Sequence, residues 1–127
     1  MNTVVVGVGS NIHPQKNTVK AKALLGRQHK LLAESTFQKT KPIGWAEQPD
    51  FLNGAILLET EQTLEQFKNS LKNIELSLGR EQTSHPDGPR TIDLDILVWN
   101  GEIINQDFYE RKFVQEAVLE IFPDLKF

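Results

Sequence analysis

The chain has 127 residues, of which 39% are hydrophobic and 24% charged, with a formal net charge of -3 and no cysteine. These values fit a single globular domain over residues 1–127, exclude disulfides and thiolate metal sites, and do not favour a nucleic-acid partner. No apolar run is long enough to cross a bilayer, and the first residues lack the basic start of a secretory signal, so we expect a cytoplasmic protein. We also expect it to be a monomer.

The first predicted elements are a strand and a helix. Residues 3–8 are mostly apolar and β-branched, which is typical of a buried strand, and the turn residues 9–11 end it. Pro14 suits the first turn of a helix that should reach about Arg27. The expected apolar face of this helix is narrow and consists of Val19, Ala23 and Leu24.

Two further strands flank a loop in the middle of the chain. A strand is expected within residues 31–40, with Phe37 inside it, and another over residues 51–59. Between them, residues 41–49 contain two prolines and a glycine, which predict a loop.

The clearest helix signal begins at Thr63. Thr63 and Gln66 match a capping box, in which each side chain bonds a backbone N–H that the first turn leaves without a partner. Gly79 stands where a left-handed residue would end the helix. Apolar residues between these two ends follow steps of three and four: Leu64, Phe67, Leu71, Ile74 and Leu78.

After a polar loop, residues 91–99 predict a fourth strand, and Asn100-Gly101 predicts a tight hairpin into residues 102–104. A last short helix before Pro123 is marked by three apolar residues, Val114, Val118 and Ile121. The order β-α-β-β-α-β is that of a ferredoxin-like α+β fold, an antiparallel sheet with both main helices on one face. A small hairpin and a C-terminal helix follow it.

Two acids in the fourth strand are the main candidates for chemistry. Same-face neighbours in a strand are about 7 Å apart, so Asp93 and Asp95 can turn toward a shared hard cation such as Mg²⁺. The alternative, a solvated face with two unrelated acids, stays open on this pattern alone. Alternation puts Asp93 and Asp95 on the open face of the sheet with Thr91 and Leu97, and turns Ile92, Leu94, Ile96 and Val98 toward the helices.

Cations and an aromatic residue accompany the acids. Arg90 precedes Asp93 by three residues and Arg80 ends the preceding helix, and arginine suits bidentate contacts with phosphate. Phe51 and Asn53 share one face of the third strand, where a ring and an amide can stack a flat heterocycle and bond its edge. The alternative for Phe51 is an ordinary core residue.

The chain resembles the 6-hydroxymethyl-7,8-dihydropterin pyrophosphokinase family of folate biosynthesis. Gly-Pro-Arg-Thr-Ile-Asp-Leu-Asp-Ile-Leu at residues 88–97 is similar to the family signature. Residues 6–11, 48–53, 74–80 and 120–125 also resemble the family, in the same order. The resemblance covers nearly the whole chain and implies transfer of pyrophosphate from ATP to the pterin hydroxymethyl oxygen, releasing AMP.

The resemblance also implies roles for particular residues. Asp93 and Asp95 would bind Mg²⁺, two ions being expected with ATP, and would form the catalytic set with Arg80 and Arg90. Nucleotide contacts would come from Arg80, Arg90 and Ile96. Contacts with the pterin substrate would come from Thr40, Ile43, Phe51, Asn53 and Phe113.

Two segments depart from the family pattern. Pro86 and Asp87 stand where a basic residue and a tryptophan are expected, and the segment after Asn105, which contributes to the ATP site in the family, is shortened. These departures leave an alternative open: a non-catalytic homologue that binds a pterin or a nucleotide.

Three further residues keep two interpretations each. Trp45 either covers the pterin pocket or anchors its loop. His85 either replaces a lost cation or is a solvated loop residue. Glu75, one helical turn before Gly79, either supports the site from behind or lies on the surface.

Overall fold

The computed structural model describes residues 1–79 and 90–127, so Arg80, His85 and the altered loop lie outside the described residues. The elements, in chain order, are β1 (Asn2–Ser10), α1 (Pro14–Gln28), β2 (Lys30–Glu34), β3 (Gln38–Thr40), β4 (Phe51–Thr60), α2 (Leu64–Ser77), β5 (Asp93–Trp99), β6 (Glu102–Ile103), α3 (Asp107–Glu110) and α4 (Lys112–Ile121).

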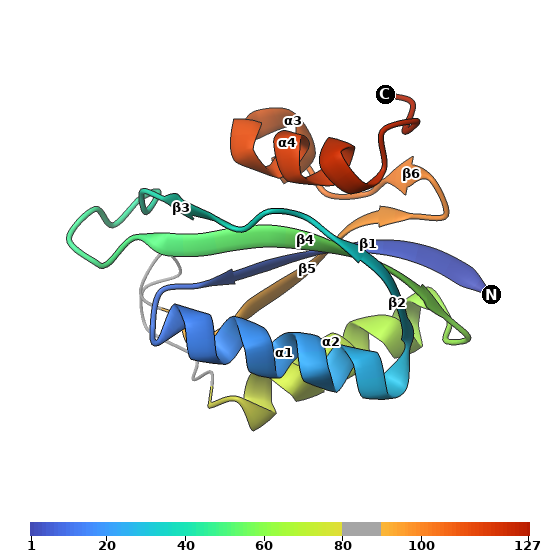
Figure 1. Cartoon of the computed structure of the whole chain (residues 1–127), viewed down its shortest axis with the longest axis horizontal. Helices are drawn as coiled ribbons and strands as arrows, with labels where there is room; N and C mark the ends of the chain where they lie inside the picture. Colours follow the sequence, from blue (N-terminus) through green and yellow to red (C-terminus); the bar gives the residue numbers. More distant parts are fainter. Residues whose placement is uncertain (80–89) are drawn as a thin grey trace.

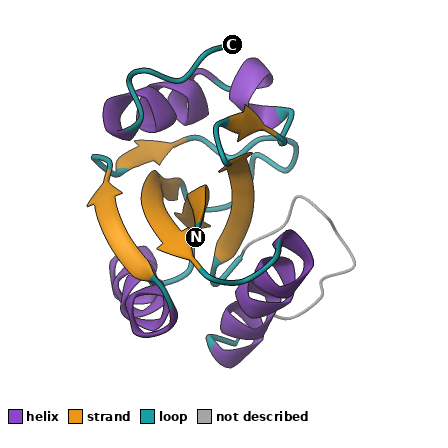
Figure 2. Cartoon of the chain, turned by 90° about the vertical axis from the view of Figure 1, so that its right-hand side faces the viewer, coloured by secondary structure: helices purple, strands orange, loops and turns teal. Residues whose placement is uncertain are grey.

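The strands form one antiparallel sheet in the order β2-β4-β1-β5-β6. β2 pairs with residues 56–59 of β4, and β3 pairs with residues 51–53 of the same strand. α1 and α2 cover one face of this sheet, while α3 and α4 lie on the other, as Figure 1 and the perpendicular view in Figure 2 show. The ferredoxin-like order, with both main helices on one face, is confirmed. The opposite face is not fully open, because the C-terminal helices cover part of it.

The face under α1 and α2 carries the larger core. Val4, Val6 and Val8 of β1 are buried against Ala21 and Leu25 of α1, among other apolar residues. The predicted apolar face of α1 was right only for Leu24, which packs against this core; the buried residues are Asn17, Thr18, Ala21 and Leu25, and Val19 is 60% exposed. A face built from small and polar residues gives a weak hydrophobic signal, because Asn17 and Thr18 count as polar although they are covered.

The predicted local signals of α2 and the last hairpin are confirmed. The Thr63 hydroxyl accepts a hydrogen bond from the Gln66 N–H at 3.2 Å, and the Gln66 side chain accepts one from the Thr63 N–H at 2.9 Å. Asn100 and Gly101 have φ of 50° and 81°, the two positive values that a tight hairpin turn requires.

The strand expected within residues 31–40 is split into β2 and β3, and Phe37 lies between them. The split occurs at Ser35, whose N–H donates to the Ala55 carbonyl while its hydroxyl accepts from the Ala55 N–H at 2.8 Å. A side chain thus replaces a backbone partner, so the regular ladder stops there. Phe37 still packs against the helix-covered core.

β5 contains a bulge that changes which side chains face the helices. Val5 pairs with Val98 but Val6 pairs with Ile96, so Leu97 is an extra residue in β5. Leu97 and Val98 therefore both belong to the core under α3 and α4, together with Val5. The prediction that Val98 faces α1 and α2 was wrong for this reason.

The shortened segment after Asn105 forms a helix that was not predicted. Asn105 accepts a hydrogen bond from the Asp107 N–H at 2.9 Å, and one turn of helix, α3, follows. Phe108 of α3 is fully buried, with its ring centroid 5.1 Å from that of Phe127. Phe108 is the buried residue of this four-residue helix, so its side chain is the main contact between α3 and the core.

Candidate functional site

A cavity of about 180 Å³ lies on the sheet face that α4 covers. Its lining brings together residues that are far apart in the sequence. Most of the residues predicted for the site line it: Thr40, Ile43, Phe51, Asn53, Arg90, Asp93, Asp95 and Phe113.

Two glycines of β1 form part of the cavity wall. Gly9 pairs with Asp93 and Gly7 with Asp95 across the β1–β5 ladder, so no β1 side chain stands beside either acid on this face. A Cβ at position 9 would lie 2.5 Å from the Asn53 Oδ1, and one at position 7 would lie 3.1 Å from a Leu97 methyl. The space beside the two acids therefore depends on glycine at both positions.

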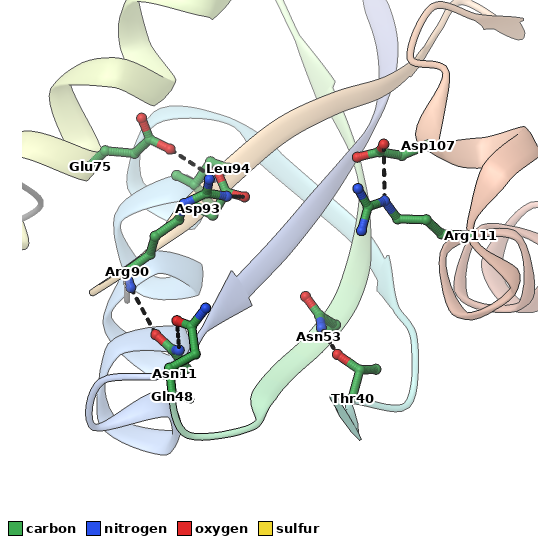
Figure 3. Close-up of polar contacts among 10 residues, drawn as sticks. All are labelled: Asn11, Thr40, Gln48, Asn53, Glu75, Arg90, Asp93, Leu94, Asp107 and Arg111. Atoms are coloured by element: carbon green, nitrogen blue, oxygen red, sulfur yellow. Dashed lines mark hydrogen bonds and ion pairs between the residues drawn. The ribbon is translucent and has the colours of Figure 1, made fainter. Parts of the chain in front are cut away.

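Asp93, the first residue of β5, forms an ion pair with Arg90. An Arg90 guanidinium nitrogen lies 3.0 Å from the Asp93 Oδ2, and both side chains are about three-quarters covered (Figure 3). The buried Asn11 fixes the Arg90 backbone, accepting from its N–H at 2.8 Å and donating its own backbone N–H to the Arg90 carbonyl. The sequence identified Asn11 only as a turn residue.

Asn11 also connects this end of β5 to the loop before β4. Its side-chain amide donates to the Gln48 Oε1 at 2.8 Å and to the Pro49 carbonyl at 3.1 Å. The Gln48 amide in turn donates to the Trp45 carbonyl at 2.7 Å. This bond holds the Trp45 backbone, while its side chain is 40% exposed, so the two interpretations of the ring both stay open.

The other end of the cavity carries the aromatic and amide groups. Phe51 and Asn53 lie on one face of β4, as predicted, and the Asn53 amide donates a hydrogen bond to the Thr40 hydroxyl (Figure 3). Phe113 approaches from α4, together with Val114 and Ala117. We call this part of the cavity, between the sheet and α4, the slot; it presents two rings and one hydrogen-bonded amide.

Sequence reasoning missed Lys41, Asp107 and Arg111, which also line the cavity. The Arg111 Nε donates to the Asp107 Oδ1 at 3.1 Å, and in Figure 3 this pair lies to the upper right of Asn53 while Asp93 lies to its upper left. The only signal for this pair in the sequence is its spacing of four residues, which is common on exposed helices.

Two predicted residues are not placed at the cavity. Ile96 is only 8% exposed and lies in the core under α1 and α2, so any nucleotide contact would have to come from its backbone. Arg80 falls outside the described ranges.

Across residues 1–79 and 90–127, no helix is long and apolar enough to cross a membrane.

Comparison with known proteins gives one consistent result. The family model for 7,8-dihydro-6-hydroxymethylpterin-pyrophosphokinase matches residues 5–123. The chain is 34% identical to the 2-amino-4-hydroxy-6-hydroxymethyldihydropteridine pyrophosphokinase of Haemophilus influenzae over 137 aligned residues, covering 98% of this chain and 84% of that protein. The protein of the same name from Bacillus subtilis is 32% identical, with coverage of 94% and 78%. The bifunctional protein FolKE of Lactococcus lactis subsp. cremoris is 33% identical, and the chain spans 38% of its length.

Proposed function

The chain belongs to the 7,8-dihydro-6-hydroxymethylpterin-pyrophosphokinase family, and we propose that the cavity between the sheet and α4 is where its reaction takes place. The chain is a transferase that moves pyrophosphate from ATP to 6-hydroxymethyl-7,8-dihydropterin in folate biosynthesis. The hydroxymethyl oxygen attacks the β-phosphorus of ATP and loses its proton. The bond from that phosphorus to the α,β-bridging oxygen breaks, so AMP leaves and the pterin diphosphate forms.

One observation carries the assignment of the site. The cavity joins an aromatic and amide slot from β3, β4 and α4 to an acid and arginine cluster from β5. A pterin with a triphosphate beside it needs these two kinds of surface next to each other. Phosphoryl-type transfer depends mainly on positioning and charge neutralisation, which this arrangement supplies without a covalent role for the protein.

The pterin would lie in the slot. Phe51 on the sheet and Phe113 on α4 would stack on the two faces of its ring system. Asn53, held by the Thr40 hydroxyl, would bond the polar edge of the pterin, with backbone groups of Thr40 and Ile43 beside it. This orientation would point the hydroxymethyl group toward β5.

The triphosphate would lie between Arg90 and Arg111. Arg90 is anchored through Asn11, and Arg111 uses its Nε for Asp107, so both cations are oriented before the nucleotide arrives. Preorganised cations of this kind stabilise charge on the transferring group without a reorganisation cost. We propose Arg80 and the backbone of Ile96 as further nucleotide contacts.

The two acids fit a magnesium site. Asp93 and Asp95 line one cavity on one face of β5, and in the described ranges no group of three or more Asp, Glu, His or Cys side chains is placed so that it could hold a metal ion. Mg²⁺ is suited to such a site because it takes few protein carboxylates and completes its shell with water and phosphate oxygens. We propose that Asp93 and Asp95 hold two Mg²⁺ ions with ATP. Bound Mg²⁺ neutralises phosphate charge and lowers the pKa of a coordinated hydroxyl.

The remaining expectations stay proposals. We propose that residues 1–127 act as a single catalytic domain, as a cytoplasmic monomer without a nucleic-acid partner. The net charge of -3 argues against a nucleic-acid partner, and the absence of cysteine fits a reducing compartment such as the cytoplasm.

The test is direct product detection. The purified chain is mixed with Mg²⁺, ATP and 6-hydroxymethyl-7,8-dihydropterin, and AMP and the pterin diphosphate are quantified by chromatography. We expect equal amounts of both products, and none when Mg²⁺ is chelated or the pterin is left out. If no AMP forms while calorimetry still detects pterin binding, the chain is a non-catalytic homologue.

A further inference from the structure

The part of β5 that carries the two acids has a strand neighbour on one side only, within the described ranges. β1 pairs with β5 from Asp93 to Trp99, but β6 pairs only with Val98 and Trp99. Because successive residues of an antiparallel strand turn their N–H groups to opposite edges, part of the Asp93–Ile96 backbone faces away from β1. These outward groups need partners from elsewhere in the protein.

Glu75 of α2 supplies one such partner at the residue between the two acids. Its Oε2 accepts a hydrogen bond from the Leu94 N–H at 2.8 Å (Figure 3). This hydrogen bond is partly buried, and it needs only an oxygen acceptor at this position of α2. The sequence left open whether Glu75 supports the site or lies on the surface, and this contact favours support.

α2 bonds the Leu94 backbone, and the Leu94 side chain is buried in the core that α2 helps to form. The Leu94 side chain is 6% exposed and belongs to the same core cluster as Ile74, the neighbour of Glu75 on α2. Its backbone N–H is bonded by Glu75. Since Asp93 and Asp95 are the residues on either side of Leu94, their backbone orientation depends on this double attachment.

We propose that Glu75 is a positioning residue for Asp93 and Asp95, acting through the Leu94 backbone to fix the distance and direction of the two carboxylates. This inference rests on the proposed function, since it assumes that the two acids bind Mg²⁺ with ATP. Partners that orient metal-binding side chains in this way typically change metal affinity or activity by about 10- to 100-fold when removed.

Three variants separate positioning from charge and from general stability. Glu75→Leu has similar size but no acceptor. Glu75→Gln keeps an oxygen acceptor and removes the charge. Thr63→Ala removes the capping box of α2 and so weakens the same helix without touching Leu94.

The first readout is the Mg²⁺ concentration that gives half-maximal AMP formation, measured with pterin affinity in parallel. We expect Glu75→Leu to raise this concentration about tenfold, and Glu75→Gln and Thr63→Ala to stay within about twofold of the unaltered protein. Pterin affinity should be unchanged in all three, because the slot is built from β3, β4 and α4.

The second readout needs no turnover. Hydrogen exchange of the Leu94 amide, followed by NMR, should be faster in Glu75→Leu and unchanged in Glu75→Gln, and Mn²⁺ binding measured by electron paramagnetic resonance should weaken only in Glu75→Leu. An unaltered metal dependence in Glu75→Leu, an equal loss in Glu75→Gln, or an equal shift in Thr63→Ala each overturns the proposal. If the unaltered protein forms no AMP, the proposed function fails, while amide exchange and Mn²⁺ binding still test the role of Glu75.

Discussion

The two walls of the cavity each carry an arginine–aspartate pair from one short stretch of chain, yet they are built differently. On the sheet wall, Arg90 and Asp93 are 3.0 Å apart, and on the helical wall, Asp107 and Arg111 are 3.1 Å apart. The sheet wall is fixed by strand register and by hydrogen bonds to backbone groups. The helical wall is fixed by side-chain packing, above all by Phe108. Substitutions in the sheet wall should therefore lower the rate of pyrophosphoryl transfer. Substitutions in the helical wall should lower the free energy of unfolding and the affinity for nucleotide.

The sheet wall is tested by removing the charge of one acid. Asp93→Asn and Asp95→Asn are each expected to lower pyrophosphoryl transfer by about 10³-fold or more, because the charge that holds the metal is lost. The measurement is AMP formation at saturating substrates. Urea unfolding serves as the control and should show a folded protein in both variants. Near-normal turnover in either variant would refute the metal assignment.

The helical wall is tested by removing its aromatic anchor. Phe108→Ala should lower the free energy of unfolding by about 3–5 kcal/mol, since a fully buried ring is lost and a cavity remains. The comparison variant is Tyr109→Ala, next in the chain and 56% exposed, whose ring packs edge-on against Phe108 at 5.3 Å and whose loss should cost at most about 1.5 kcal/mol. Equal effects in urea unfolding would show that α3 is not held by Phe108.

The arginine–aspartate pair of the helical wall is tested by steady-state kinetics. Arg111→Ala should raise the KM for ATP by about 10- to 100-fold, because a charge-assisted phosphate contact is lost, with little change in pterin affinity. Asp107→Ala should have a smaller effect of a few-fold, because Arg111 keeps its charge but loses its orientation. An unchanged KM for ATP in Arg111→Ala would remove the helical wall from the nucleotide site.

His29 should make the stability of the fold depend on pH, and it belongs to neither wall. It is 7% exposed, its ring lies 4.9 Å from that of Phe67, and neither of its nitrogens has a hydrogen-bond partner in the described part of the chain. Burial lowers the pKa of His29 below its ordinary value of about 6.5, because the charged form is poorly solvated there. The unfolded chain therefore binds this proton more readily. The contribution of neutral His29 to the free energy of unfolding should be fully present above pH 6.5. It should be lost as the pH falls from there through the lowered pKa of the folded state.

The check on this prediction is urea unfolding at pH 7.5 and 5.5. His29→Phe should flatten the part of the pH dependence that comes from this site. The catalytic effects of the wall variants at neutral pH should be the same with or without it. An unchanged slope in His29→Phe would mean that other groups control acid stability.

The sheet wall could be predicted from sequence because strand alternation and side-chain chemistry are both local. Asp93 and Asp95 were placed on one face by period alone, and Phe51 and Asn53 likewise. Of the helical wall, only Phe113 was expected, and that from the family resemblance, because membership of the cavity depends on where α4 lies on the sheet. Asp107 and Arg111 have the spacing of an ordinary surface pair, so nothing nearby marks them.

Other errors have the same origin. The β5 bulge that turns Val98 away from α1 and α2 has no local signature, because Leu97 and Val98 are ordinary strand residues. Phe37 was expected inside a strand, but Ser35 takes over a backbone role that composition does not reveal. In each case a tertiary contact overrode a correct reading of local preference.

Gly7 and Gly9 have a consequence for how this protein can change. Valine and isoleucine are better strand formers than glycine, so a substitution at either position would improve local propensity. At position 9 it would nevertheless push against the Asn53 Oδ1, and at position 7 against Leu97. A mutational scan should therefore find two positions where the residues that strengthen the strand are the ones that close the cavity. Thermostability engineering of this enzyme has to leave both glycines alone.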